Sequence, residues 1–126
     1  GIYAPEVSQR TYDELFRRAE AFLAGGISVV LDATFTGEDS RQRCRELADR
    51  LGVKLLMVLV DCPERTVISR LRRRANQTGF SDANLEIYRI MKERFKTPRS
   101  GPGLLRIDSR QPVRRSLEQI ERRLRI

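Results

Sequence analysis

The sequence contains no histidine and no tryptophan, and it has two cysteines among 126 residues. The absence of histidine excludes Ser-His-Asp triads, histidine metal sites and histidine pH switches. Cys44 and Cys62 form neither a CxxC pair nor a disulfide framework, so we expect both to be reduced packing residues. The longest apolar run, at 53–60, is too short to cross a bilayer, and no signal-peptide core opens the chain. We therefore expect a soluble, cytoplasmic protein.

The composition predicts a single domain over residues 1–126. It is 40% hydrophobic and 33% charged, which fits a compact fold with a modest core. The net charge of +8 and the pI near 10.5 favour contact with nucleic acid or another polyanion. Aromatic residues make up only 6%, and no RNP, KH or helix-turn-helix signature occurs, so base-specific recognition has no support. We expect the arginine-rich stretch at 114–125 to form the solvated side of the last helix.

The spacing of apolar residues predicts helices alternating with short strands. Continuous apolar or β-branched runs predict three strands, at 27–31, 53–60 and 104–107. Helical spacing predicts five helices, which begin near Ser8 or Thr11, at Asp39, at Pro63, after Ser81 and at Pro112. Thr11 and Glu14 fit a capping box, and Gly25 and Gly52 fit helix ends. This order predicts an α/β fold with three α/β/α layers around a parallel sheet.

Ligands of such sheets bind at the carboxyl ends of the strands. The residues at these ends include Asp32, Asp61 and Asp108. Asp32 follows three apolar residues, Val29 to Leu31, which is the pattern by which P-loop enzymes hold Mg²⁺ near the nucleotide phosphates. Taken alone, Asp32 fits a cap of a neighbouring turn equally well.

Several short motifs occur in an order and spacing found in a known family. They are Gly1-Ile-Tyr-Ala-Pro-Glu6, the helix near Thr11, Val30-Leu-Asp-Ala-Thr-Phe35, Arg41, Asp61-Cys-Pro-Glu64, Arg70 with Arg74, and Ser81-Asp-Ala83. In these the chain resembles small P-loop kinases of the polynucleotide kinase and zeta-toxin type. The likeness is greatest to the predicted AAA-family kinase domain fused behind aminoglycoside phosphotransferase-like domains, and it spans about residues 1–98. It implies a nucleotide-kinase-like P-loop NTPase fold that moves the γ-phosphate of ATP to a hydroxyl with Mg²⁺.

The resemblance also implies a set of site residues. Asp32 would bind Mg²⁺ and act in catalysis, and Arg70 and Arg74 would bind the nucleotide from a lid at about 64–96. Arginine suits this role because its planar fork binds phosphate oxygens in pairs, and residues four apart share a helix face. Arg110, in the loop after the last strand, would contact the nucleotide. Thr34, Arg41 and Tyr3 would contact the phosphate acceptor.

Each assignment has a plainer alternative. Arg72 and Arg73 fit a solvated basic face, and Thr34 and Arg41 fit a cap or a surface position. Thr11 and Tyr12, like Tyr3, lie where the family builds its acceptor pocket, but Tyr12 also belongs to the apolar stripe of its helix, so a core position is the safer interpretation for it. The loop at 108–112 fits an ordinary strand-to-helix turn.

One motif of the family is missing. No G-x-x-x-x-G-K-[ST] occurs in these 126 residues, and the aspartate that serves the family as acceptor base lies further upstream. In the family's strand order the phosphate-loop strand lies between the strands ending at Asp32 and Asp61. We therefore expect residues before Gly1, or a partner chain, to supply this central strand. The present chain would then be a carboxyl-terminal portion, inactive alone.

Three functions remain open from the sequence. The first is a portion of an ATP-dependent kinase that acts on a small molecule or a nucleic-acid end. The second is a basic module that binds nucleic acid. The third is a degenerate kinase fold kept for assembly. The acceptor cannot be assigned, because the fold does not choose among a small alcohol, a sugar, an antibiotic and a nucleic-acid 5′-hydroxyl.

Overall fold

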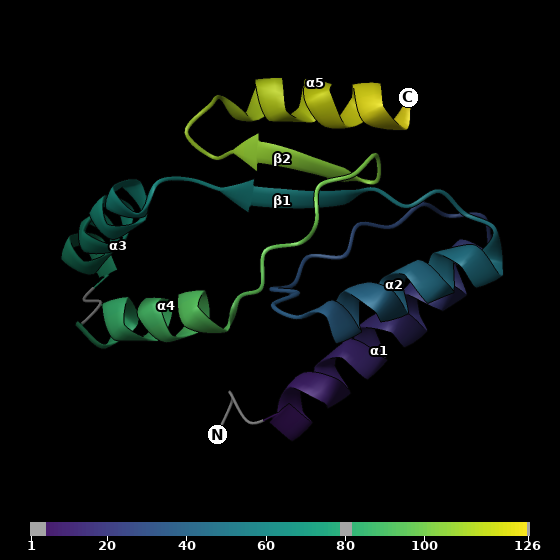
Figure 1. The fold of residues 1–126 in the computed structure, drawn as a ribbon, viewed down its shortest axis with the longest axis horizontal. Coiled ribbons are helices and arrows are strands. Elements are labelled where there is room, and N and C mark those ends of the chain that lie inside the picture. Colours follow the sequence, from purple (N-terminus) through teal and green to yellow (C-terminus); the bar gives the residue numbers. More distant parts are fainter. Residues whose placement is uncertain (1–4, 79–81, 126) are drawn as a thin grey trace. The chain divides into compact units, whose positions relative to one another are not determined.

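The computed structural model describes residues 5–78 and 82–125, which fall into two compact units with bounds Gly1–Leu55 and Leu56–Ile126. The first unit holds α1 (Pro5–Ala24) and α2 (Glu38–Leu51). The second holds β1 (Met57–Asp61), α3 (Glu64–Thr78), α4 (Asp82–Arg94), β2 (Leu104–Asp108) and α5 (Val113–Leu124) (Figure 1). The mixture of helices with a two-stranded parallel sheet is compatible with the predicted α/β class. The single-domain and three-layer predictions stay predictions.

In the first unit, α1 and α2 pack side by side and run in the same direction. Arg43 lies 2.7 Å from Asp13, and Arg50 pairs with Glu20, so the partner numbers rise together along both helices. The chain returns from the end of α1 to the start of α2 through an extended segment at 27–36 (Figure 1). The buried apolar residues come from both helices: Phe16, Ala19, Cys44, Leu47 and Ala48.

The start of α1 differs from the sequence prediction. The helix begins at Pro5, so Thr11 lies inside it and the predicted capping box is wrong. Proline suits a first helical position because it has no N–H that would need a partner there. Glu14 instead accepts hydrogen bonds from Arg17 and Arg18, one turn further along, and the pKa of its carboxyl is lowered to about 2.

The predicted strand at 27–31 is also wrong. The segment is extended but belongs to no sheet among the residues that the structure describes. Val30 is 93% exposed and Ile27 is exposed as well. A strand needs a neighbour for its backbone N–H and C=O groups, and a strand apolar on both faces needs cover on both. The sequence pattern is that of a central strand, but this unit offers it no neighbour.

In the second unit, β1 and β2 form a parallel pair. Met57 lies opposite Leu104 and Asp61 opposite Asp108, so both strands end at the same level. The strands predicted at 53–60 and 104–107 are confirmed, although the first begins four residues later than predicted. The ladder begins at Met57 because β2 begins at Leu104, after a turn in which Leu104 N–H donates to the Gly101 carbonyl. α5 packs against β2, and α3 packs against α4.

The other helix predictions are confirmed to within one residue. α2 to α5 begin at Glu38, Glu64, Asp82 and Val113, while the cap expected at Ser81 lies outside the described residues. α2 ends at Gly52, whose φ of +66° is left-handed and favours glycine. Both cysteines are free; Cys44 is buried, and burial raises the pKa of its thiol. None of the described helices is long and apolar enough to span a membrane.

The second unit leaves apolar surface uncovered. β2 occupies one edge of β1, and the described residues place no strand at the other edge. Val58 and Val60 share a sheet face with the buried Ile107, yet Val60 is 60% exposed. Apolar side chains of α5 are likewise only partly covered, since Val113 and Leu117 are exposed. An open strand edge beside exposed valines is the geometry that another strand can extend.

The packing of α1 against α2 in the first unit can be tested directly by substitution. Phe16 is 7% exposed, whereas Phe22 on the same helix is 52% exposed, although both belong to the predicted apolar stripe. We expect Phe16→Ala to lower the free energy of unfolding by about 3 kcal/mol, because it leaves a cavity in the core that α1 and α2 share. Phe22→Ala, the matched control, should cost less than about 1 kcal/mol. Urea denaturation measures both, and equal losses would contradict the assigned packing.

Candidate functional site

Residues 32–35, which follow Leu31 and which we call the acidic turn, are held in place at Phe35. Phe35 has a φ of +43°, a left-handed conformation that is costly for a bulky residue. Its amide N–H donates to Tyr12 Oη at 2.8 Å, and its carbonyl accepts from Arg41 Nε at 2.9 Å. Its ring lies 5.2 Å from the Tyr12 ring and 6.4 Å from the Phe16 ring, centroid to centroid. Residues on both helices therefore fix the backbone on each side of Phe35.

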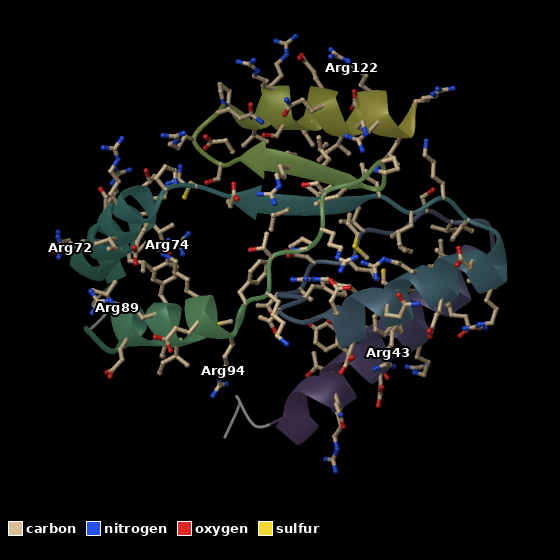
Figure 2. The ribbon with its side chains drawn as sticks, in the orientation of Figure 1. Arg43, Arg72, Arg74, Arg89, Arg94 and Arg122 are labelled. Carbon is tan, nitrogen blue, oxygen red and sulfur yellow. The ribbon has the colours of Figure 1, made fainter. Side chains whose placement is uncertain are left out.

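Arg41 lies inside the first unit. It is 3% exposed, and its Nη1 donates to Glu38 Oε1 at 2.9 Å besides the bond to Phe35. That hydrogen bond is the main cause of the lowered pKa of the Glu38 carboxyl. The resemblance implied contact with the acceptor, whereas in this unit Arg41 bonds the backbone of its own turn. It thus differs from the exposed Arg43, whose guanidinium lies 4.8 Å above the Phe16 ring (Figure 2).

Asp32 and Thr34 carry the exposed polar side chains of this turn. Thr34 Oγ1 lies 3.4 Å from Tyr12 Oη. Mg²⁺ in kinases usually takes one or two carboxylates and completes its shell with phosphates and water. The exposed Asp32 carboxylate fits such a site. No group of three or more Asp, Glu, Cys or His that could hold a metal occurs in the part of the chain that the structure describes.

The carboxyl ends of β1 and β2 form a second polar cluster, in the other unit. Ser109 N–H donates to the Asp61 carbonyl at 2.9 Å, which continues the ladder one step beyond the sheet. Arg70, half-buried on α3, donates from Nη1 to Ser109 Oγ at 2.8 Å and from Nη2 to Ser109 O at 3.0 Å. Arg70 thus joins α3 to the loop after β2.

Arg110 is paired within its own loop. Its guanidinium binds both carboxylate oxygens of Asp108, with Nη2 at 2.6 Å from Oδ2, and its backbone N–H donates to Oδ1 at 2.8 Å. The side-chain hydrogen bonds from Arg110, aided by its backbone N–H, lower the pKa of Asp108 to about 2. The charge of Arg70 acts in the same direction.

The remaining predicted residues are placed less tightly. Arg74 is exposed on α3, and Arg72 leaves the helix on a different side (Figure 2). Such divergence is expected for residues two apart on a helix. Tyr3 lies outside the described residues. The structure brings Thr34 and Arg41 to one turn, and it brings Arg70 and Arg110 to one loop, so the candidate residues form two groups, one in each unit.

Sequence reasoning missed the bonds of two participants. For Tyr12 it favoured a core position over the acceptor pocket that the resemblance implied; the ring of Tyr12 is in the core cluster, and its hydroxyl binds the turn. Ser109 was part of a predicted loop with no role of its own, and it accepts both bonds from Arg70. The position of Tyr12 on the apolar stripe one residue after Thr11 gave no signal of its bond to residue 35.

Comparison with known protein families assigns the chain to one of them. A family model described as an AAA domain matches residues 2–98. The chain belongs to the AAA domain family. The AAA domain match supports a P-loop NTPase-like, nucleotide-binding domain, and its span agrees with the resemblance at about 1–98. No curated protein and no solved structure matches the chain.

The AAA domain match divides the candidate residues. It includes Asp32, Thr34, Arg41, Arg70 and Arg74, and it ends at residue 98. β2 and the loop that holds Ser109 and Arg110 lie beyond it. A nucleotide-binding role for Arg110 therefore has no support from the family match.

The pairing of Asp108 with Arg110 predicts an acid titration. Because the pKa of Asp108 in the folded protein, about 2, lies below its ordinary 3.8, the pair is fully formed above about pH 4 and is lost as the pH falls toward 2. Carboxyl NMR of the folded protein should show Asp108 titrating at the low end of this window. In Arg110→Gln the pKa should move back toward 3.8. An unchanged pKa in that variant would show that Arg110 is not its cause.

Proposed function

We propose that residues 1–126 are the carboxyl-side part of a P-loop kinase that transfers the γ-phosphate of ATP to a hydroxyl. The observation that carries this proposal is the AAA domain match over residues 2–98, which includes both the Val30-Leu31-Asp32 pattern and the arginines of α3. An acidic turn for Mg²⁺ and a helix of arginines for phosphate are two of the parts that phosphoryl transfer uses. The chain offers one candidate for each, one in each unit.

Arg70 is suited to stabilise a transferring phosphate. Phosphoryl transfer asks the protein for positioned cations more than for covalent chemistry. The two bonds to Ser109 fix the Arg70 guanidinium at the carboxyl ends of the strands, where ligands of α/β sheets bind. Those bonds use two of its five N–H donors. A guanidinium held by a neutral serine keeps its full positive charge.

Asp32 would hold Mg²⁺ through its exposed carboxylate. When bound there, Mg²⁺ neutralises charge on the nucleotide phosphates. The chain's own contribution is to place the Asp32 carboxylate. Phe35, three residues after Asp32, has its backbone hydrogen-bonded by Tyr12 on α1 and by Arg41 on α2, which holds this turn in place. Thr34 offers a hydroxyl next to it.

The phosphate-binding loop and its strand would come from outside these residues. Two features support this part of the proposal: the free edge of β1 beside exposed Val58 and Val60, and the apolar segment at 27–31 that has no strand neighbour in its unit. A preceding segment of the same chain or a partner chain would supply a parallel strand and the Gly-rich loop with its lysine. Direct pairing of the 27–31 segment with β1 in the active protein would contradict it.

A second candidate function follows from the charge distribution. Residues 1–55 carry 8 Lys and Arg against 9 Asp and Glu, a net −1, whereas residues 56–126 carry 17 against 8, a net +9. The basic character thus belongs to the second unit alone. Such asymmetry favours binding of a polyanion such as nucleic acid. As a kinase acceptor or as a separate ligand, nucleic acid would bind this unit.

The arginine assignment gives the main test of the kinase proposal. In the protein that includes the P-loop segment, ATP turnover should require Mg²⁺ and stop on chelation. Arg70→Ala and Arg74→Ala should each lower turnover by roughly 10³-fold, because each removes a cation from the transferring phosphate. Asp32→Asn should lower Mg²⁺-dependent turnover to a similar extent.

Arg72→Ala and Arg73→Ala are the matched controls, since they remove the same charge from the same helix. We expect turnover within about twofold of the wild type in both. Equal losses in all four arginine variants would indicate a general charge effect and would remove the assignment of Arg70 and Arg74. Absence of any transfer by the wild-type protein, tested with alcohols, sugars and 5′-hydroxyl oligonucleotides, would contradict the kinase proposal.

The nucleic-acid candidate predicts a steep dependence on salt. Affinity for a single-stranded oligonucleotide, measured by fluorescence anisotropy, should fall with salt at a log–log slope of about −0.7 per neutralised phosphate. Binding that neither ATP nor Mg²⁺ changes would favour a separate binding module over a kinase acceptor site. A flat salt dependence would contradict polyanion binding by residues 56–126.

A further inference from the structure

The left-handed backbone of Phe35 needs an explanation, because placing the Asp32 carboxylate three positions earlier does not by itself require a strained residue. A non-glycine residue in this region costs about 1–3 kcal/mol, and it persists only where the surrounding structure fixes it. Phe35 and Arg125 are the non-glycine residues with positive φ among those the structure describes. Arg125 ends a helix, where this conformation is ordinary. Phe35 ends no helix and directly follows Thr34.

Two side chains fix both polar groups of Phe35. Tyr12 accepts its N–H at 2.8 Å, and Arg41 donates to its carbonyl at 2.9 Å. Tyr12 comes from α1 and Arg41 from α2, so the backbone of Phe35 is held from both helices, which also bury Phe16 and Leu47. We refer to Tyr12 and Arg41 as the turn clamp.

Arg41 is committed to this clamp. A guanidinium that is 3% exposed loses most of its hydration, which is costly unless hydrogen bonds replace it. The Phe35 carbonyl and the Glu38 carboxylate provide such bonds. A neutral apolar residue could fill the same space without that cost. The burial of a charge here thus indicates a need to hold this carbonyl in place.

Tyr12 links the clamp to Thr34. A phenol has one proton to donate, and Tyr12 Oη already acts as acceptor for the Phe35 N–H. Toward Thr34 Oγ1, at 3.4 Å, Tyr12 can therefore act as donor. Thr34 then accepts, and its own hydroxyl proton is directed away from Tyr12. Such bonds are often long before a ligand binds and tighten in the complex.

We propose that Tyr12 and Arg41 are positioning residues that orient the exposed Thr34 hydroxyl as a hydrogen-bond donor to a phosphate oxygen. The inference rests on the proposed kinase function and adds two residues to its machinery, neither of which touches the phosphate itself. It also assigns Arg41 to the turn backbone instead of to the acceptor.

A double-mutant cycle tests the link between Tyr12 and Thr34. In the protein that includes the P-loop segment, Tyr12→Phe removes the hydroxyl and keeps the ring, and Thr34→Val removes the proposed donor. We expect each to lower kcat/KM by roughly tenfold and the double variant to be no slower than Thr34→Val alone. Thr34→Ser should retain activity within about threefold, because it retains the hydroxyl. A purely structural role for Tyr12 would give effects that multiply.

The matched control is Ser40→Ala. Ser40 Oγ donates to the Gly37 carbonyl at 3.2 Å, so the variant removes a hydroxyl from the same region without affecting Phe35 or Thr34. We expect kcat/KM within about twofold of the wild type. A tenfold loss in Ser40→Ala would show that any hydroxyl near this turn matters, and it would overturn the inference.

Hydrogen exchange tests the clamp without any activity. The Phe35 amide should exchange slowly in the wild type and at least tenfold faster in Tyr12→Phe, while the amides of α2 keep their rates. A Phe35 amide that exchanges freely in the wild type overturns the clamp even in an active enzyme. Multiplicative effects in an active enzyme overturn the positioning of Thr34 and leave the kinase proposal standing. A wild-type protein without phosphate transfer overturns both the kinase proposal and the inference.

Discussion

Hydrogen bonding between parallel strands is the constraint on which most of this structure depends. A strand without a neighbour leaves its backbone N–H and C=O groups to water, and an apolar strand so placed also exposes its side chains. β1 satisfies one edge with β2 and orders the loops at their common ends, including the bond from Ser109 to Asp61. The segment at 27–31 has the same kind of sequence but no strand neighbour among the residues that the structure describes, and its Val30 is in solvent.

This constraint explains how far the fold could be predicted. Helix starts and ends are local events, so α2 to α5 and the stop at Gly52 follow from nearby residues. The strand at 27–31 could not be judged locally, because strand formation depends on a partner whose sequence is elsewhere. The failed capping box at Thr11 has a simpler cause: Pro5 begins the helix earlier, and a Thr-x-x-Glu pattern inside a helix looks the same in sequence as one at its start.

The sequence predicted which residue types make up the candidate site, but not the hydrogen bonds that join them. An aspartate after an apolar run and arginines four apart are visible in the sequence, and the family match covers them. The bond between Tyr12 and the backbone of Phe35 spans 23 positions and involves an atom that every residue possesses. A pattern of side chains in the sequence therefore cannot predict such a bond. Arg41 could be recognised as an arginine near the turn, but its burial and its direction depend on how the two helices pack.

The arginines show why a charge count alone does not describe the site. Arg110 is neutralised by Asp108, and Arg41 is paired with Glu38 inside its unit. Arg70 is held by the hydroxyl and carbonyl of Ser109, which orient the guanidinium without cancelling its charge. When neutral acceptors fix a guanidinium, its side-chain entropy is already lost before a ligand binds, and its positive charge can still attract an anion. At the strand ends of the second unit, the positive field therefore depends on Arg70 more than on Arg110, although the sequence presents both as the same residue.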